Sequence, residues 1–228
     1  MKRMLCLSLP LANSLTPYIL SGKQLKYQQL MKDCSIVICN GDAGTGKTMM
    51  ACHEGIRLLK DKQIEKLVIT RPTSTVDGED LGFLPGKVEE KMHPFILPMY
   101  DYFLEFYTKD GIASLINTGK LEIAPLCFMR GRTFKNSFLI CDEMQNASKN
   151  QMKMLLTRIG DKSKLIITGD VKQSDIGMEN GLSHLLSSLE TKYTEPFKMY
   201  KDGFGVVQLD SSCIQRHPII KSVLELYE

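Results

Sequence analysis

The chain has 228 residues, of which 43% are hydrophobic and 24% are charged, and its formal net charge is +3. This length suits one well-packed domain and leaves little room for two. The small charge excludes overall basicity as a means of binding nucleic acid, so such a contact would need a local arrangement of Lys and Arg.

The first 23 residues are predicted to be an extension ahead of the domain. Met1-Lys2-Arg3 and the apolar residues after it resemble the start of a signal peptide, but this run is short and Pro10 interrupts it. No run in the chain approaches the roughly 18 apolar residues that a membrane span needs. We therefore expect a cytoplasmic protein that has no membrane partner.

Short apolar runs alternate with helix-like segments along the rest of the chain, which is typical of βαβ units and an α/β fold. Residues 137–142 and 164–170 are apolar on both alternating faces, as expected for strands of a mostly parallel sheet that helices cover on both sides. Both runs end in acidic residues, at the carboxyl edge where such sheets bind ligands. The predicted strands are Ile36–Asn40, Lys66–Arg71, Leu121–Ala124, Ser137–Asp142, Lys164–Asp170 and Phe204–Asp210.

The alternation is interrupted between Arg71 and Leu121. Residues 77–86 contain several glycines and acidic residues and predict an insertion or loop, and residues 93–107 resemble an aromatic helix. The helical spacing of the aromatics favours core packing over a platform for stacking bases. These aromatics are Phe95, Tyr102, Phe103, Phe106 and Tyr107.

The seven cysteines have no CxxC spacing. Cys39, Cys127 and Cys141 lie in or beside apolar, strand-like runs, so we expect them to be reduced core residues. The four histidines are scattered and offer no metal-ligand spacing.

A phosphate-binding loop is predicted between the first strand and a helical segment, Met49 to Lys60. Its glycines let backbone N–H groups approach a β-phosphate, and the helix N-terminus adds partial positive charge. Lys47 would reach the β- and γ-phosphates of ATP, and the Thr48 hydroxyl would bind Mg²⁺. The loop consists of Gly41, Asp42, Ala43, Gly44, Thr45, Gly46, Lys47 and Thr48.

Two carboxylates follow the apolar run Phe138–Cys141. Asp142 would hold Mg²⁺ through water, and Glu143 would orient and deprotonate the attacking water. After the next run, Gln173 could sense the γ-phosphate or align the lytic water. Asp170 could support the metal site, although Gly169 and Asp170 also suit an ordinary turn.

Together these segments resemble the PhoH-like ATPases, relatives of the ATP-binding half of superfamily-1 helicases. The resemblance covers nearly the whole chain from about Gln24, and the motifs occur in the order usual for the family. They are GDAGTGKT, Arg71-Pro72, GEDLGFLPG (78–86), RGRTF (130–134), DEMQN (142–146), QMKMLLTRIG (151–160), TGDVKQSD (168–175) and RHP (216–218).

The resemblance implies a single RecA-like P-loop domain over residues 24–228, as in short bacterial or phage-encoded members, which binds and hydrolyses ATP and acts on RNA. It implies that Gln24 reads adenine, that Asp142 and Glu143 form the Walker B pair and that Gln173 senses the γ-phosphate. The sequence departs from the usual pattern at Asp42 (usually Pro), Met144 (usually Ala) and Gln215 (usually Val). None of these side chains is one that contacts phosphate in the family.

Superfamily-1 helicases use two RecA-like domains, whereas this length supplies one. We therefore expect a homo-oligomer, with a hexameric ring as the hypothesis, in which an arginine of one subunit reaches the γ-phosphate of its neighbour. The candidates are Arg130, Arg132 and Arg216; Arg216 could instead act in its own subunit. Arg71, Arg130 and Arg132 are also candidate contacts to single-stranded RNA or DNA.

Two functions remain open at this point. The first is a nucleic-acid-coupled ATPase of helicase type, which Gln24, Glu143 and Gln173 favour. The alternative is a regulatory module whose ATP state controls a protein partner without strand translocation. A small-molecule kinase lacks an evident acceptor site, and a GTPase is disfavoured because no NKxD element appears. Mg²⁺ brought with ATP is the only metal that we expect.

Overall fold

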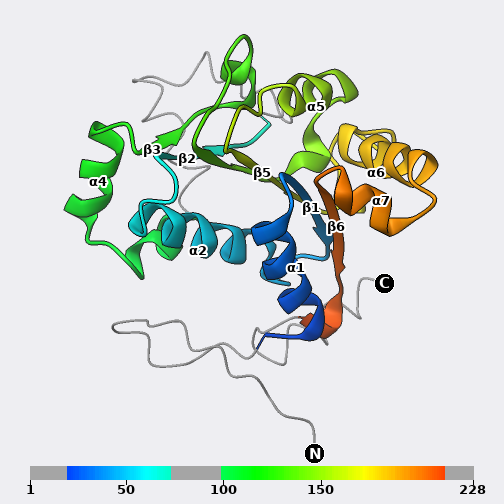
Figure 1. Ribbon diagram of the computed structural model, residues 1–228, viewed down its shortest axis with the longest axis horizontal. Coiled ribbons are helices and arrows are strands. Elements are labelled where there is room, and N and C mark those ends of the chain that lie inside the picture. The colour runs from blue at the N-terminus through cyan, green and yellow to red at the C-terminus, as the bar shows by residue number, and fades with distance from the viewer. Residues whose placement is uncertain (1–19, 73–98, 214–228) are drawn as a thin grey trace, which may run out of the picture.

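A computed structural model describes residues 20–72 and 99–213 (Figure 1). Six strands form one sheet in the order β3-β2-β4-β5-β1-β6. Every neighbouring pair of these strands is parallel. The strands are β1 Ile36–Gly41, β2 Lys66–Thr70, β3 Leu121–Ile123, β4 Ser137–Cys141, β5 Lys164–Gly169 and β6 Phe204–Leu209. The predicted α/β fold is therefore confirmed, and each strand starts at its predicted residue.

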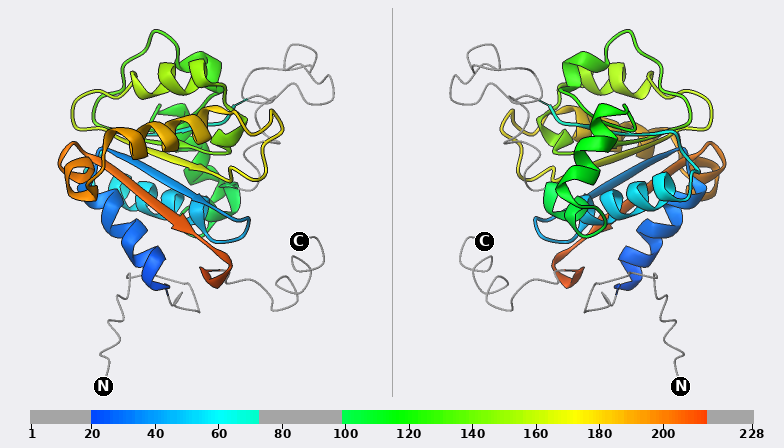
Figure 2. Two further views of the ribbon diagram at one scale, coloured as in Figure 1. Left: turned by 90° about the vertical axis from the view of Figure 1, so that its right-hand side faces the viewer. Right: turned by 90° about the vertical axis from the view of Figure 1, so that its left-hand side faces the viewer.

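Helices cover both faces of the sheet, as Figure 2 shows. The α-helices are α1 Gly22–Asp33, α2 Lys47–Lys60, α4 Lys109–Asn117, α5 Lys149–Leu156, α6 Gly181–Lys192 and α7 Pro196–Lys201. Residues 99–104 are also helical. The described residues also contain three short 3₁₀ helices, η2 Leu126–Met129, η3 Met144–Asn146 and η4 Ser211–Cys213. Among the described residues, no helix is long and apolar enough to cross a membrane.

The alternation of side chains along each strand divides the core in two. Val37 and Cys39 of β1 pack with α1, α2, α4 and residues 99–104, whereas Ile36 and Ile38 pack with α5 and α6 on the other face. Successive strand residues point to opposite faces, so an uninterrupted apolar strand serves both halves of the core. The sheet is thereby fixed between two helical layers.

The aromatic residues after position 99 belong to the core. Phe103 is buried, and Tyr102, Phe106 and Tyr107 pack against the same cluster. The prediction of core packing is confirmed for these four, whereas Phe95 lies outside the described residues, as does the 78–86 motif.

The prediction for the cysteines is confirmed for Cys39 and Cys141, which are fully buried, and wrong for Cys127, which is exposed. The reason is the 3₁₀ geometry of η2, in which residues three apart share one face. Leu126 and Met129 occupy the inward face, so Cys127 is turned to solvent. The six described cysteines are all free thiols.

The strand order determines which loops meet at the carboxyl edge. β5 lies between β1 and β4 and pairs with both, so Gly169 ends β5 between the ends of the other two strands. The loop after β1, the residues after β4 and the loop after β5 are therefore neighbours. These three segments contain most of the predicted catalytic residues.

Candidate active site

The loop after β1 connects directly to the N-terminus of α2. Gly46 is the N-cap of α2 with φ +88°, a left-handed conformation that favours glycine. The Thr45 hydroxyl closes the loop by donating to the Asp42 carbonyl at 2.8 Å. No side chain in the described residues caps α2, and its first turn carries no acidic residue. The backbone N–H groups of that turn are thus suited to an anion.

Lys47 is folded back over this loop. Its ammonium donates to the carbonyl oxygens of Gly41 at 2.6 Å and Asp42 at 2.8 Å. The positive charge therefore lies over the concave side of the loop, where it can exchange a carbonyl oxygen for a phosphate oxygen. The reach of Lys47 to the β- and γ-phosphates of ATP stays a prediction.

Asp42, the departure from the usual proline, faces a cation of the β5 loop. The Lys172 ammonium lies 3.5 Å from the Asp42 carboxylate, and both side chains are at least partly exposed. An exposed pair of this kind contributes little to stability. It does offset the negative charge that Asp42 brings close to the phosphate loop.

Asp142 follows β4 and is only 1% exposed. Its Oδ1 accepts hydrogen bonds from the hydroxyls of Thr48, at 2.6 Å, and Thr168. Its Oδ2 accepts from Arg71, whose Nε lies at 2.9 Å and whose Nη2 also contacts it. The buried carboxylate is thus balanced by one guanidinium and two hydroxyls.

Thr48 and Asp142 form a donor set that fits Mg²⁺. Both offer oxygen atoms, the ligand type that Mg²⁺ prefers, and their oxygens are in direct contact at the end of the phosphate loop. Arg71 donates a hydrogen bond to the other oxygen, Oδ2, of the Asp142 carboxylate. The cation of Arg71 therefore lies close to the place where a metal cation would be held.

Replacing Arg71 with alanine should destabilise the protein more without nucleotide than with Mg²⁺ and an ATP analogue bound. Asp142 would keep its buried charge without a cationic partner, which costs about 3 kcal/mol of unfolding free energy. Mg²⁺ with a non-hydrolysable ATP analogue should restore much of the loss, because it brings positive charge to the same carboxylate. Thermal denaturation with chelator and with Mg²⁺ and the analogue measures both effects.

The control for this prediction is Arg57→Ala, which breaks an ion pair with Glu54 near the end of α2 that lies away from the phosphate loop. Its effect on the melting temperature should be the same in both conditions. An Arg71→Ala deficit that is equally large with and without Mg²⁺ and the analogue would contradict the prediction.

Glu143 has a left-handed backbone with φ +55°, which is uncommon for a residue other than glycine. Its carboxylate accepts a hydrogen bond at 2.6 Å from Nε2 of Gln145, a buried side chain of η3. Sequence reasoning assigned no role to Gln145 or to Thr168. Both residues are polar and lie next to the predicted end of a strand, at the ligand-binding edge of the sheet. This position is the feature of the sequence that could have identified them as site residues.

The loop after β5 begins with a turn. The Asp170 carboxylate accepts the Lys172 N–H at 3.0 Å, as in an ordinary turn, and its support of a metal site stays a prediction. Gln173 is exposed, and its carbonyl oxygen lies 3.5 Å from Gln145 Nε2. The structure thus brings Gln173 next to the segment that contains Glu143.

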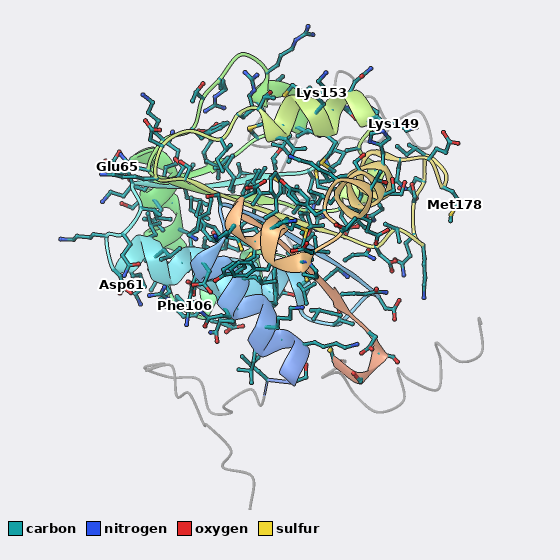
Figure 3. The ribbon with its side chains drawn as sticks, turned by 45° about the vertical axis from the view of Figure 1, so that its right-hand side comes forward. Asp61, Glu65, Phe106, Lys149, Lys153 and Met178 are labelled. Carbon is teal, nitrogen blue, oxygen red and sulfur yellow. The ribbon has the colours of Figure 1, made fainter. Side chains whose placement is uncertain are left out.

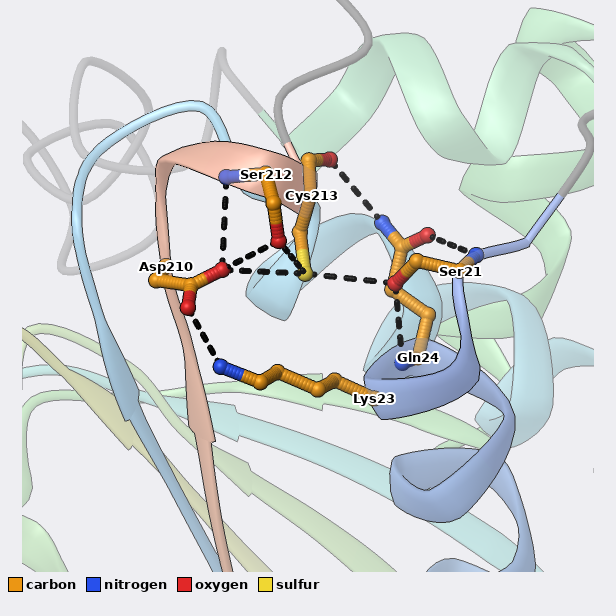
Figure 4. A network of polar contacts seen from close by, with 6 residues as sticks. All are labelled: Ser21, Lys23, Gln24, Asp210, Ser212 and Cys213. Carbon is orange, nitrogen blue, oxygen red and sulfur yellow. Dashed lines mark hydrogen bonds and ion pairs between the residues drawn. The ribbon is translucent and has the colours of Figure 1, made fainter.

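Gln24 lies beside the phosphate loop from the α1 side (Figure 4). Its Nε2 donates to the carbonyls of Thr45 at 3.0 Å and Cys213 at 3.3 Å, and its Oε1 accepts the Ser21 N–H at 2.9 Å. The amide is buried and joins α1, η4 and the loop. Its location agrees with a place near a nucleotide, and the reading of adenine stays a prediction.

An ion pair between Lys23 and Asp210 reinforces the same junction (Figure 4). The hydrogen bond from Lys23, together with that from Ser212, holds the pKa of the Asp210 carboxyl at about 2. The start of α1 is therefore tied to the end of β6 at ordinary pH.

Of the remaining candidate arginines, the structure describes Arg130 and Arg132. Arg132 forms two hydrogen bonds with Glu122, at 2.5 and 2.9 Å, and its guanidinium lies 4.6 Å from the Phe134 ring centroid. Arg130 is exposed beside η2. Arg216 lies outside the described residues, as does Gln215. The structure thus brings together the phosphate loop, Arg71, Asp142, Glu143 and Gln173.

Comparison with solved structures supports the fold. The large terminase from a thermophilic bacteriophage aligns with a TM-score of 0.50 at 13% identity, over 90% of this chain and 50% of that chain. A second structure of that terminase, in complex with ADP, gives a TM-score of 0.50 at 12% identity. At this identity the likeness concerns the RecA-like P-loop fold alone.

Comparison with sequences is more specific. The model of the PhoH-like protein family matches residues 18–228. A PhoH-like protein of Bacillus subtilis is 40% identical over 207 residues, covering 90% of this chain and 62% of the relative. One of Synechocystis is 39% identical over 208 residues, covering 90% and 60%. The chain thus spans less than two thirds of the length of these relatives. The chain belongs to the PhoH-like protein family.

Proposed function

We propose that this protein binds ATP with Mg²⁺ and hydrolyses it. The observation that carries the proposal is the contact of Asp142 with Thr48 at the end of the phosphate loop, with Glu143 as the next residue. This arrangement provides an oxygen site for the metal and a carboxylate for the attacking water within one site.

Each residue has a distinct role in the proposed reaction. Lys47 and the N–H groups of α2 bind the phosphates, and Thr48 and Asp142 hold Mg²⁺, which when bound neutralises charge on the β- and γ-phosphates. Glu143 orients a water molecule and takes its proton, and Gln173 senses the γ-phosphate. Gln24 is proposed to contact adenine, by exchanging part of its present hydrogen bonding.

We further propose that ATP turnover is coupled to single-stranded RNA or DNA. The support is a small exposed surface on η2, where Phe128 is 51% exposed and lies two residues from the exposed Arg130. An aromatic ring for base stacking beside a cation for phosphate is a pairing that single-strand binders use. Lys153 projects from α5 and adds an exposed cation, whereas Lys149 of the same helix pairs with Glu179 at 3.2 Å (Figure 3).

The test is ATP turnover at several salt concentrations with and without single-stranded RNA and DNA. We expect stimulation of about tenfold that weakens as salt rises, because phosphate contacts release counterions. Phe128→Ala should remove most of the stimulation and leave basal turnover unchanged, whereas Lys198→Ala on α7 should alter neither. Turnover that no strand stimulates would favour the alternative, an ATP-dependent module acting on a protein partner.

We also propose that the active form is a homo-oligomer, with a hexameric ring as the working hypothesis, in the bacterial cytoplasm. The support is that the described residues form a single nucleotide-binding core, whose γ-phosphate side a neighbouring subunit would complete. Arg130, Arg132 or Arg216 would then reach that side from a neighbouring subunit or, for Arg216, from its own. Light scattering should show an oligomer in ATP; a monomer with full turnover would contradict this.

A further inference from the structure

We propose that Gln145 is a positioning residue that holds the Glu143 carboxylate and couples it to the loop that carries Gln173. The inference rests on the proposed ATP hydrolysis, in which Glu143 acts on the attacking water. Gln145 itself is only 2% exposed and lies in η3, so it acts through its neighbours and not on the substrate.

The Gln145 amide has a partner on each side. Its Nε2 donates to Glu143 Oε2 at 2.6 Å, and its Oε1 accepts the backbone N–H of Asp170 at 3.1 Å. The first bond lies within the segment after β4, whereas the second crosses to the segment after β5. One side chain thus fixes the distance between the two loops of the candidate active site.

The fit of this amide depends on the last residue of β5. A Cβ added at Gly169 would lie 2.7 Å from Gln145 Oε1 and 3.2 Å from the Gln145 backbone nitrogen. Contacts of that length would force the amide to shift. Glycine at position 169 therefore leaves the space that the Gln145 side chain occupies.

The backbone of Glu143 needs such support. A left-handed conformation at a residue other than glycine is strained and persists only where surrounding contacts hold it. The bond from Gln145 to the Glu143 carboxylate is a contact of this kind. Without it, the carboxylate would be free to turn away from the water that it orients.

Further bonds make the two loops one unit. Asn146 Nδ2 donates to Asp175 Oδ2 at 2.6 Å, and the Asp175 N–H donates to Asn146 Oδ1 at 2.9 Å. The Ser174 hydroxyl donates to the Gln145 carbonyl at 2.9 Å. Gln173 lies within this linked segment, so a movement of Gln173 toward a γ-phosphate would be transmitted to Glu143.

The decisive variant is Gln145→Met, which keeps the length of the side chain and removes both hydrogen bonds. We expect kcat for ATP to fall about 10- to 100-fold, since small misplacement of a catalytic group has effects of this size. ATP affinity, measured by binding to the protein, should change less than about twofold because Lys47 and Thr48 are untouched. Gln151→Met, the same change at the helix-capping glutamine of α5, is the matched control and should leave kcat unaltered.

A double-mutant cycle separates positioning from a general structural effect. If Gln145 acts through Glu143, then adding Gln145→Met to Glu143→Gln should lower kcat no further. If the kcat loss of the double variant equals the product of the two single losses, the proposal is overturned. A folded Gln145→Met protein with the kcat of the wild type would also overturn it. If that variant does not fold, Gln145→Glu carries the same test, because it keeps the shape and the acceptor and opposes Glu143 with a like charge.

Amide hydrogen exchange in the nucleotide-free protein gives a readout that needs no ATPase activity. The Asp170 amide should exchange faster in Gln145→Met because it loses its acceptor, while the Asp175 amide, bonded to Asn146, should be much less affected. Unchanged exchange at Asp170 would overturn the coupling. A wild-type protein without ATP turnover would instead refute the proposed function, so the two failures are distinguishable.

Discussion

Lys47→Ala is expected to reduce kcat/KM for ATP by about 10³-fold, with most of the loss in binding and in stabilising charge on the transferred phosphoryl group. The reason is the location of the Lys47 ammonium, which contacts two carbonyl oxygens of the phosphate loop. No other Lys or Arg among the described residues makes such a contact with this loop. ATP titration and steady-state turnover measure the two components separately.

Stability should distinguish this effect from misfolding. Lys47 donates two part-buried hydrogen bonds to loop carbonyls, which contribute modestly to stability, so Lys47→Ala should melt within a few degrees of the wild type in the absence of nucleotide. ATP should raise the melting temperature of the wild type and not that of the variant. Lys198→Ala, which removes an exposed lysine paired with Glu195, should retain turnover and ATP stabilisation. Wild-type ATP affinity in Lys47→Ala would contradict the assignment of the loop.

The strands could be predicted from the sequence because each one is a local signal. A run such as Lys164–Gly169 is apolar at successive positions and is followed by polar residues, and burial on both faces of a parallel sheet produces this pattern. The phosphate loop is equally local, since its residue types and the strand and helix beside it are contiguous. The fold class and the phosphate loop at Gly41–Thr48 can therefore be predicted from the sequence without knowledge of the tertiary structure.

The side-chain partners across the sheet could not be predicted in the same way. Arg71 was a candidate contact to nucleic acid at a strand end, and the structure turns it toward Asp142, a residue 71 positions away in the chain. That contact depends on β2 and β4 being neighbours with Thr70 opposite Cys141. Pairing and register are long-range properties, so no local pattern specifies them.

The departure at Asp42 shows the same limit. In the sequence, Asp42 is an extra negative charge within the predicted phosphate loop, with no local partner to offset it. In the structure Lys172 lies opposite, because the β5 loop adjoins the β1 loop at the carboxyl edge. The sequence contains both residues, but only the strand order makes them neighbours.

Glu143→Gln is the second substitution with a large expected effect. It keeps the size of the side chain and removes the carboxylate that would take a proton from the attacking water, so kcat should fall about 10³-fold. ATP affinity should remain within about threefold of the wild type, because Glu143 contacts neither Lys47 nor Thr48 in the described structure. Single-turnover hydrolysis measures the chemical step, and nucleotide titration measures binding.

The control for this substitution is Glu179→Gln, at an exposed carboxylate in the same loop region as Gln173. It should leave kcat unchanged, which separates loss of the Glu143 carboxylate from a general loss of negative charge. If Glu143→Gln instead raised KM at constant kcat, then Glu143 would contribute to binding and not to the chemical step. With normal kcat and normal KM, the water would have to be activated elsewhere, and the left-handed backbone at Glu143 would have no catalytic explanation.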